Sequence, residues 1–119
     1  MIYIQPMKRS IDGEMIKGHT DMLILALLGG GTSMHGYLIR QKLCDISRQV
    51  VHPSLGRIYP LLARMEKKGW LKSRQETVCE SRVRKTYSIT ARGRAELKVR
   101  LKKWELFSDG INRILKKCT

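Results

Sequence analysis

The feature that most restricts the fold of this chain is the spacing of apolar residues near its C-terminus. They recur at alternating steps of four and three, with one serine among them, at Leu97, Leu101, Trp104, Ser108, Ile111, Leu115 and Cys118. This spacing is typical of helices that pack along a seam. A long helix that projects past a small domain buries such a stripe on a partner, unless it folds back onto its own domain. We predict a C-terminal dimerisation helix over residues 91–119, with a dimer interface at Leu97, Leu101, Trp104, Ile111 and Leu115.

Two helices are predicted in the first half of the chain. Thr20 or Asp21 can cap the first, which is apolar on every side and is therefore expected at the centre of the core. Ser33 is the expected cap of the second, over about residues 34–48. Its core-facing residues are predicted to be Tyr37, Leu38, Leu43 and Ile46.

A third helix and a β-hairpin follow. The helix extends from Ser54 to Gly69 and has one apolar stripe with basic residues outside it. Extended runs over 70–78 and 83–90 predict the hairpin. Three helices and a hairpin are the element order of a winged helix-turn-helix, in which a helix fits the DNA major groove and the hairpin follows the backbone. The predicted fold is mainly α with a small β-hairpin.

The length of 119 residues predicts one compact unit with little room for a second function. We divide it into an N-terminal arm over residues 1–18, a winged helix-turn-helix domain over 19–90 and the dimerisation helix over 91–119. The arm and the first helix are expected to cover the flank of the dimer seam.

The charge of the chain favours a polyanionic partner. It carries 24 Lys and Arg against 10 Asp and Glu, a net charge of +14. Residues 1–50 hold six bases and four acids, whereas residues 51–119 hold eighteen and six, so the excess of +12 lies in the second part. Such a surface attracts phosphate and makes binding depend on salt.

Other function classes receive little support from the sequence. The 3 cysteines and 3 histidines lack metal-ligand spacing, so no metal and no cofactor are predicted. The longest apolar run is too short to span a membrane, and an odd number of cysteines fits a reducing compartment, which together predict a cytoplasmic location. No nucleophile–base pair or glycine-rich phosphate loop is visible, and we predict that the chain is not an enzyme.

Three stretches resemble the PadR family of transcriptional regulators: HGYLIRQKL at 35–43, PSLGRIYPLLARMEKKGWL at 53–71 and RKTYSITARGRAEL at 84–97. The matching positions are His35, Gly36, Tyr37, Ser54, Gly56, Tyr59, Pro60, Glu66, Gly69, Arg84, Lys85, Tyr87, Thr90 and Gly93. Pro60 conflicts with a helix on general grounds, but the family carries this proline routinely. The chain departs from the pattern at Arg57, where threonine is usual, which leaves open which bases are read.

Eight residues are the predicted DNA contacts. Arg57 lies one turn into the third helix, where an arginine can read guanine, unless it is only a solvated surface residue. Ser54 is a helix cap or a phosphate contact, and the resemblance favours a phosphate contact for Tyr59 over a place in the core. Phosphate contacts are also expected from Arg64 and Lys67 on the helix and from Arg82, Arg84 and Lys85 on the hairpin.

The resemblance also implies how such a protein acts. It implies a homodimer of the small subgroup with a single C-terminal helix, bound to an inverted-repeat operator. It further implies a repressor that a small molecule releases from DNA. Trp104 then packs in the dimer core, lines a flat cavity for a planar aromatic effector, or does both. The alternative function is non-specific binding of nucleic acid, as in an RNA-binding or architectural protein.

Overall fold

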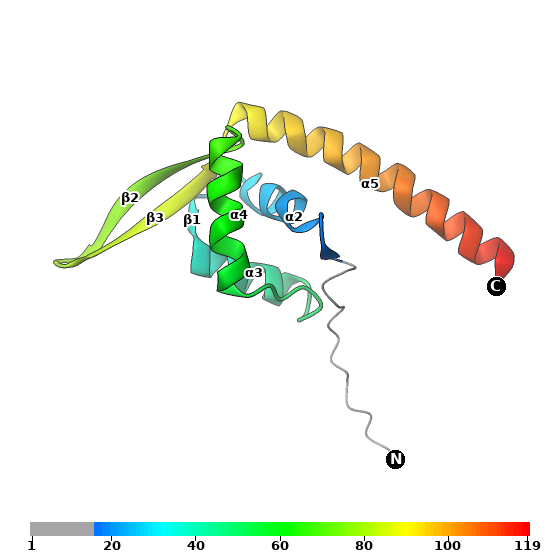
Figure 1. Cartoon of the computed structure of the whole chain (residues 1–119), viewed down its shortest axis with the longest axis horizontal. Coiled ribbons are helices and arrows are strands. Elements are labelled where there is room, and N and C mark those ends of the chain that lie inside the picture. Colours follow the sequence, from blue (N-terminus) through cyan, green and yellow to red (C-terminus); the bar gives the residue numbers. More distant parts are fainter. Residues whose placement is uncertain (1–15) are drawn as a thin grey trace, which may run out of the picture.

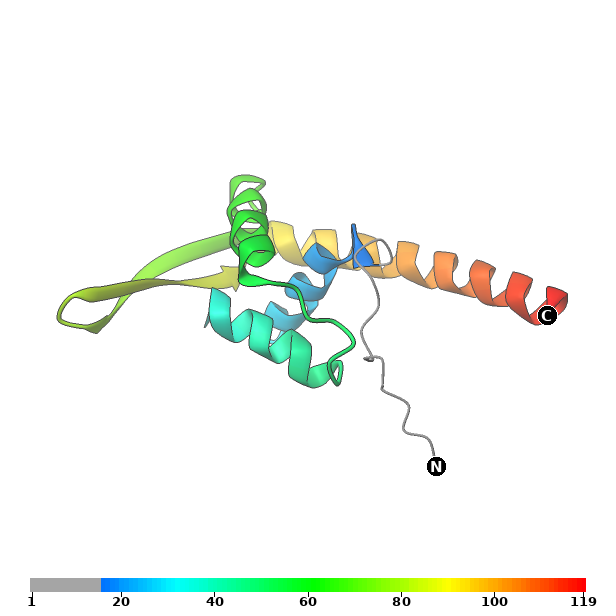
Figure 2. The same cartoon turned by 60° about the horizontal axis from the view of Figure 1, so that its bottom comes forward.

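The computed structural model describes residues 16–119, so most of the predicted arm lies outside the described residues. The elements are α2 (Thr20–Leu28), β1 (Met34–His35), α3 (Gly36–Ile46), α4 (Leu55–Lys67), β2 (Leu71–Cys79), β3 (Arg82–Ile89) and α5 (Ala91–Cys118). The β2–β3 hairpin and α5 extend in opposite directions from a body formed by α2, α3 and α4 (Figures 1 and 2). This arrangement confirms the predicted winged helix architecture with a long C-terminal helix.

The core lies between α2, α3, α4 and the base of the sheet. The central position predicted for α2 is confirmed, since Ile24, Leu25 and Leu28 are fully buried. Helix α4 contributes the apolar stripe expected from its sequence. None of the helices in the described part of the chain combines the length and apolar character needed to cross a bilayer.

The start of α3 differs from the prediction. Ser33 does not cap this helix; instead the Nδ1 atom of His35 accepts a hydrogen bond from the Leu38 amide at 3.3 Å. The helix begins two residues later than predicted because Met34 and His35 form β1, which pairs with β3. A strand of two residues is too short to show an alternating pattern in the sequence.

The core-facing side of α3 was also partly mispredicted. Tyr37 and Ile46 are 53% and 70% exposed, whereas Ile39 and Cys44 lie in the core with the correctly predicted Leu43. Residues 34–48 offer two overlapping apolar stripes, and the packing of α2 and α4 selects the one through Ile39. The predicted cap of α2 was also wrong, since the N-cap is His19 and not Thr20 or Asp21.

The sheet has the strand order β1-β3-β2 and is antiparallel throughout. Leu71 pairs with Ile89 and Ser73 with Tyr87, so these residues share the face that meets the helices. Near the tip, a bulge between Thr77 and Cys79 shifts the register before the turn that leads into β3. The hairpin is therefore anchored at its base and exposed at its tip.

Thr90 links the base of the hairpin to the end of α4 and the start of α5. Its hydroxyl lies 2.6 Å from the carbonyl oxygen of Gly69 and 3.0 Å from that of Trp70, and it accepts the Gly93 amide at 3.0 Å. Thr90 thus caps α5. A Cβ atom at Gly93 would overlap the Trp70 carbonyl, so only glycine allows the first turn of α5 to lie this close to the start of β2.

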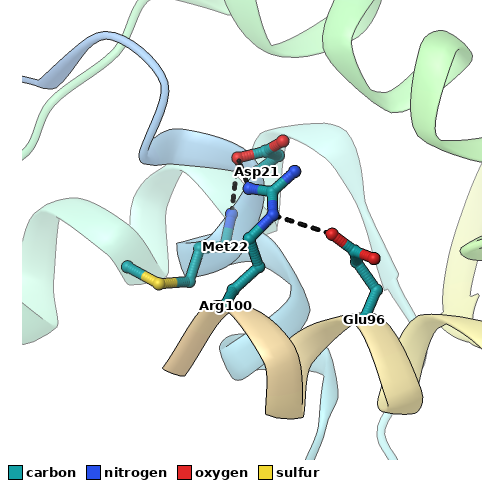
Figure 3. Close-up of polar contacts among 4 residues, drawn as sticks. All are labelled: Asp21, Met22, Glu96 and Arg100. Atoms are coloured by element: carbon teal, nitrogen blue, oxygen red, sulfur yellow. Dashed lines mark hydrogen bonds and ion pairs between the residues drawn. The ribbon is translucent and has the colours of Figure 1, made fainter. Parts of the chain in front are cut away.

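The first half of α5 packs on α2 of the same chain. Arg100 donates from Nη1 to Asp21 at 2.9 Å and from Nε to Glu96 at 2.8 Å (Figure 3). The bond to Asp21 contributes most to the raised pKa of Arg100. Leu97 packs against the chain's own core, while the apolar residues from Leu101 onward stay exposed. The folding-back alternative therefore holds for the start of the predicted seam.

We predict that Thr90→Val destabilises the protein by about 1–2 kcal/mol, because it removes the cap of α5 and leaves the Gly69 carbonyl without its hydroxyl donor. Urea unfolding at a fixed protein concentration measures the change. Thr77→Val on the exposed part of β2 is the matched control and is expected to stay within about 0.5 kcal/mol of wild type. Equal stability of Thr90→Val and Thr77→Val would contradict the role of Thr90 in linking the hairpin to α4 and α5.

Candidate nucleic-acid interface

Helix α4 has one buried side and one basic side. Ile58, Leu62 and Met65 are buried by the core, and this burial fixes the rotation of the helix about its axis. Arg57 and Arg64 lie about two turns apart on the exposed side, and Lys67 follows on the same side one turn later. The sequence pattern predicted both sides correctly.

The N-terminal end of α4 is open to a ligand. Ser54 has the extended backbone of an N-cap, but its hydroxyl makes no capping hydrogen bond within residues 16–119. The Ser54 carbonyl accepts the amides of Arg57 and Ile58, each at 3.0 Å. Pro60 lies inside α4 and the helix continues to Lys67, as the family resemblance implied.

Tyr59 connects α4 to the start of α3. Its ring lies against Gly36, where an added Cβ atom would overlap the ring and approach its Cζ atom to 3.0 Å. Tyr59 remains 47% exposed, so it is not a core ring. Sequence reasoning matched both residues to one motif but missed their contact, because neither periodicity nor spacing links positions 23 residues apart.

The cap at His35 requires an uncharged ring. Burial lowers the pKa of His35, the positive charge of Arg84 lowers it further, and Glu76 acts in the opposite direction. A neutral ring leaves Nδ1 able to accept the Leu38 amide. The lowered pKa and the hydrogen bond therefore agree, and His35 satisfies a local backbone amide.

The basic residues of the hairpin do not form one cluster. Arg84 lies opposite Glu76 and forms an ion pair with it at 3.3 Å, with both side chains exposed. Lys85 lies opposite Gln75 and points to the other face, since neighbouring residues of a strand alternate. Arg82 follows the turn and shares the face of Arg84. A ligand on one face of the hairpin thus meets two of the three predicted cations.

Comparison with known proteins identifies the family of the chain. The sequence pattern of the transcriptional regulator PadR-like family matches residues 24–99, well over half of the chain. The chain belongs to the PadR-like family. The match runs from the middle of α2 to the first turns of α5 and includes α4 and the hairpin.

Solved PadR-like structures share this fold. A transcriptional regulator from Clostridium thermocellum is 30% identical with a TM-score of 0.77, over 85% of this chain and 97% of that one. A PadR family regulator from Eggerthella lenta is 28% identical with a TM-score of 0.76, over 86% of each chain. An uncharacterized protein from Lysinibacillus sphaericus is 28% identical over 108 residues, which are 85% of this chain and 98% of the relative.

Membership of the PadR-like family makes the chain a DNA-binding regulator of transcription and not an enzyme. In a winged helix protein of this order, α4 corresponds to the recognition helix and β2–β3 to the wing. The exposed basic side of α4 is therefore the candidate surface for the major groove.

The contact between Gly36 and Tyr59 allows a direct test of how α3 packs on α4. Gly36→Ala forces the Tyr59 ring away from α3, and we expect a loss of about 1–3 kcal/mol in stability from overpacking, measured by urea unfolding. Adding Tyr59→Ala to this variant removes the clash and is expected to restore most of that loss. Gly30→Ala, where a Cβ meets no atom within 4 Å, is the matched control. Equal effects at Gly30 and Gly36 would show that the Tyr59 contact is unimportant.

Proposed function

We propose that this PadR-like regulator is a repressor that binds an inverted-repeat operator as a homodimer. The observation that carries the proposal is the basic side of α4, which the core holds in a fixed orientation on a winged helix scaffold. Two such helices related by a dyad match half-sites about one DNA turn apart, or a multiple of it. The cytoplasmic location remains a prediction, supported by the need to reach the chromosome.

The proposed contacts follow from position on α4 and the wing. Arg57 reads a base, because its place one turn into the recognition helix is where side chains reach base edges. Phosphates are held by Arg64 and Lys67 and, at the two ends of the interface, by Ser54, Tyr59, Arg82, Arg84 and Lys85. The Ser54 hydroxyl, which makes no capping hydrogen bond within residues 16–119, and the half-exposed ring of Tyr59 support those two roles.

We predict that Arg57→Ala and Lys67→Ala weaken DNA binding in different ways. Arg57→Ala is expected to cost about 1–3 kcal/mol on the operator and to relax preference at one position in each half-site. Lys67→Ala is expected to weaken all duplexes alike and to reduce the salt slope by about 1. Fluorescence anisotropy over a salt series, with DNA from upstream of the gene and a scrambled duplex, measures both.

The same titration separates the proposal from non-specific binding. A base-reading regulator prefers its operator to the scrambled duplex by about 10³-fold or more. Equal affinity for both duplexes, or for RNA, would favour the alternative of a basic RNA-binding or architectural protein. Unchanged base discrimination in Arg57→Ala would remove Arg57 from the reading role while leaving the regulator intact.

The exposed part of α5 supports the homodimer. This helix has 28 residues, about 42 Å at 1.5 Å per residue, and only its first half packs on α2. The seam residues that follow Leu97 in the predicted interface, Leu101, Trp104, Ile111 and Leu115, are each 41–52% exposed along one stripe. A second copy of the same helix is complementary to that stripe, as expected of a two-fold interface.

We predict that Ile111→Glu converts the dimer into a monomer, because it places a charge in the centre of the apolar stripe. Leu106→Glu is the matched control, since Leu106 is 67% exposed and lies on the opposite side of α5. Sedimentation velocity measures the state of association. A monomeric wild type, or identical behaviour of the two variants, would contradict dimerisation through this stripe.

A groove beside Trp104 supports release by a small molecule. Its volume is about 480 Å³ and its lining includes Met22, Trp104 and Phe107. The Trp104 ring lies 5.3 Å from His19 in an edge-to-face arrangement and 5.9 Å from Phe107. Such a wall fits a planar aromatic effector. Quenching of tryptophan fluorescence by planar aromatic compounds tests this role, and we expect the quenching to be lost in Trp104→Leu. If Trp104→Leu leaves the quenching unchanged, the effector does not bind at Trp104.

A further inference from the structure

A second hollow lies on the outer face of the sheet, away from the Trp104 groove. Its volume is about 600 Å³. The loop that precedes β1 forms one wall with Gly31 and Ser33, strands β2 and β3 form the floor, and Arg94 of α5 closes one end. None of the DNA contacts proposed above contributes to this lining.

The strand register places two cations on the floor of this hollow. Lys72 pairs with Ser88 and Arg74 with Thr86. These pairs alternate along the strands with the pairs that face the core, Leu71–Ile89 and Ser73–Tyr87. The side chains of the two cations therefore point away from α4, which packs on the opposite face through a 2.6 Å hydrogen bond from Ser73 to Glu66. Lys72 and Arg74 are both exposed.

Arg94 adds a third cation that is held in place. Its Nη1 atom donates to the Gly29 carbonyl at 2.9 Å, which orients the guanidinium and leaves its other N–H groups available. Within residues 16–119, the carboxylate on this face of the strands, Glu76, is paired with Arg84 and not with the floor cations. The hydroxyls of Ser33 and Ser88 add neutral donors.

This combination has a defined chemical preference. Three positive groups around one concavity concentrate anions there more strongly than the same charges on a flat surface. Arginine matches the geometry of phosphate oxygens, and hydroxyl donors complete their hydrogen bonds. We propose that the hollow is a binding site for a small phosphate-bearing molecule.

The DNA backbone is a poor candidate for the same site. The duplex is expected on the exposed side of α4 and toward the tip of the hairpin, where Arg82 and Arg84 share the face of the hollow, whereas the hollow itself lies at the base of this face beside Arg94. Along the strands, Arg84 lies opposite Glu76, four residues of β2 from Lys72, about 13 Å. A small phosphate compound can therefore enter the hollow while the protein stays bound to its operator.

Titration with sodium pyrophosphate, followed by amide NMR shifts at constant ionic strength, tests the proposal. Saturable shifts are expected in residues 31–33, 72–74 and 86–88. The variant Lys72→Gln/Arg74→Gln is expected to weaken pyrophosphate binding about tenfold or more. Lys116→Gln/Lys117→Gln removes the same charge from exposed positions on α5 and is expected to stay within about twofold of wild type.

Three results would overturn the proposal. Shifts that fail to saturate, or that spread over α4 and the wing tip, would show general attraction of anions to a basic protein. Equal weakening in the two double variants would show the same. A loss of operator affinity in Lys72→Gln/Arg74→Gln beyond that of the control would assign the hollow to the duplex. Operator binding that persists in both variants leaves the proposed regulator intact in every case.

Discussion

The burial of one side of α4 is the interaction on which the rest of the structure depends. Ile58, Leu62 and Met65 are at most 1% exposed, and burying side chains of this size contributes about 1.5–3 kcal/mol each. Because the three define the rotation of the helix, they also define the direction of its basic side. Arg57 and Lys67 therefore face outward, and little backbone freedom remains to be lost when the helix binds DNA.

A short segment connects this helix to both the wing and α5. Gly69 ends α4, Trp70 leads into β2, and Thr90 binds the carbonyls of both while capping α5. A change in the direction of α5 at Gly93 must therefore move the base of the wing and the end of α4. This gives a physical route by which a molecule bound beside Trp104 can favour one separation of two recognition helices over another.

The sequence predicted those parts of the fold that are encoded locally. The stripe of α4 and the hairpin each depend on residues a few positions apart. Features decided by distant partners were missed: β1 requires β3, the buried side of α3 requires α2 and α4, and the Gly36–Tyr59 contact joins two helices. Strand alternation places Arg84 and Lys85 on opposite faces of the hairpin, which the prediction of DNA contacts did not take into account. The residues that touch DNA stay predictions, since no duplex defines them.

The central claim is that two copies of α4 enter the major groove of one operator. Methylation interference tests it most directly, because methyl groups at guanine N7 lie in that groove. The account predicts two symmetric clusters of interfering guanines, with centres about 10 bp or a multiple of 10 bp apart. In Arg57→Ala, the interference at one guanine of each cluster is expected to disappear. A single asymmetric cluster, or binding that tolerates methylation at every guanine, would contradict the account.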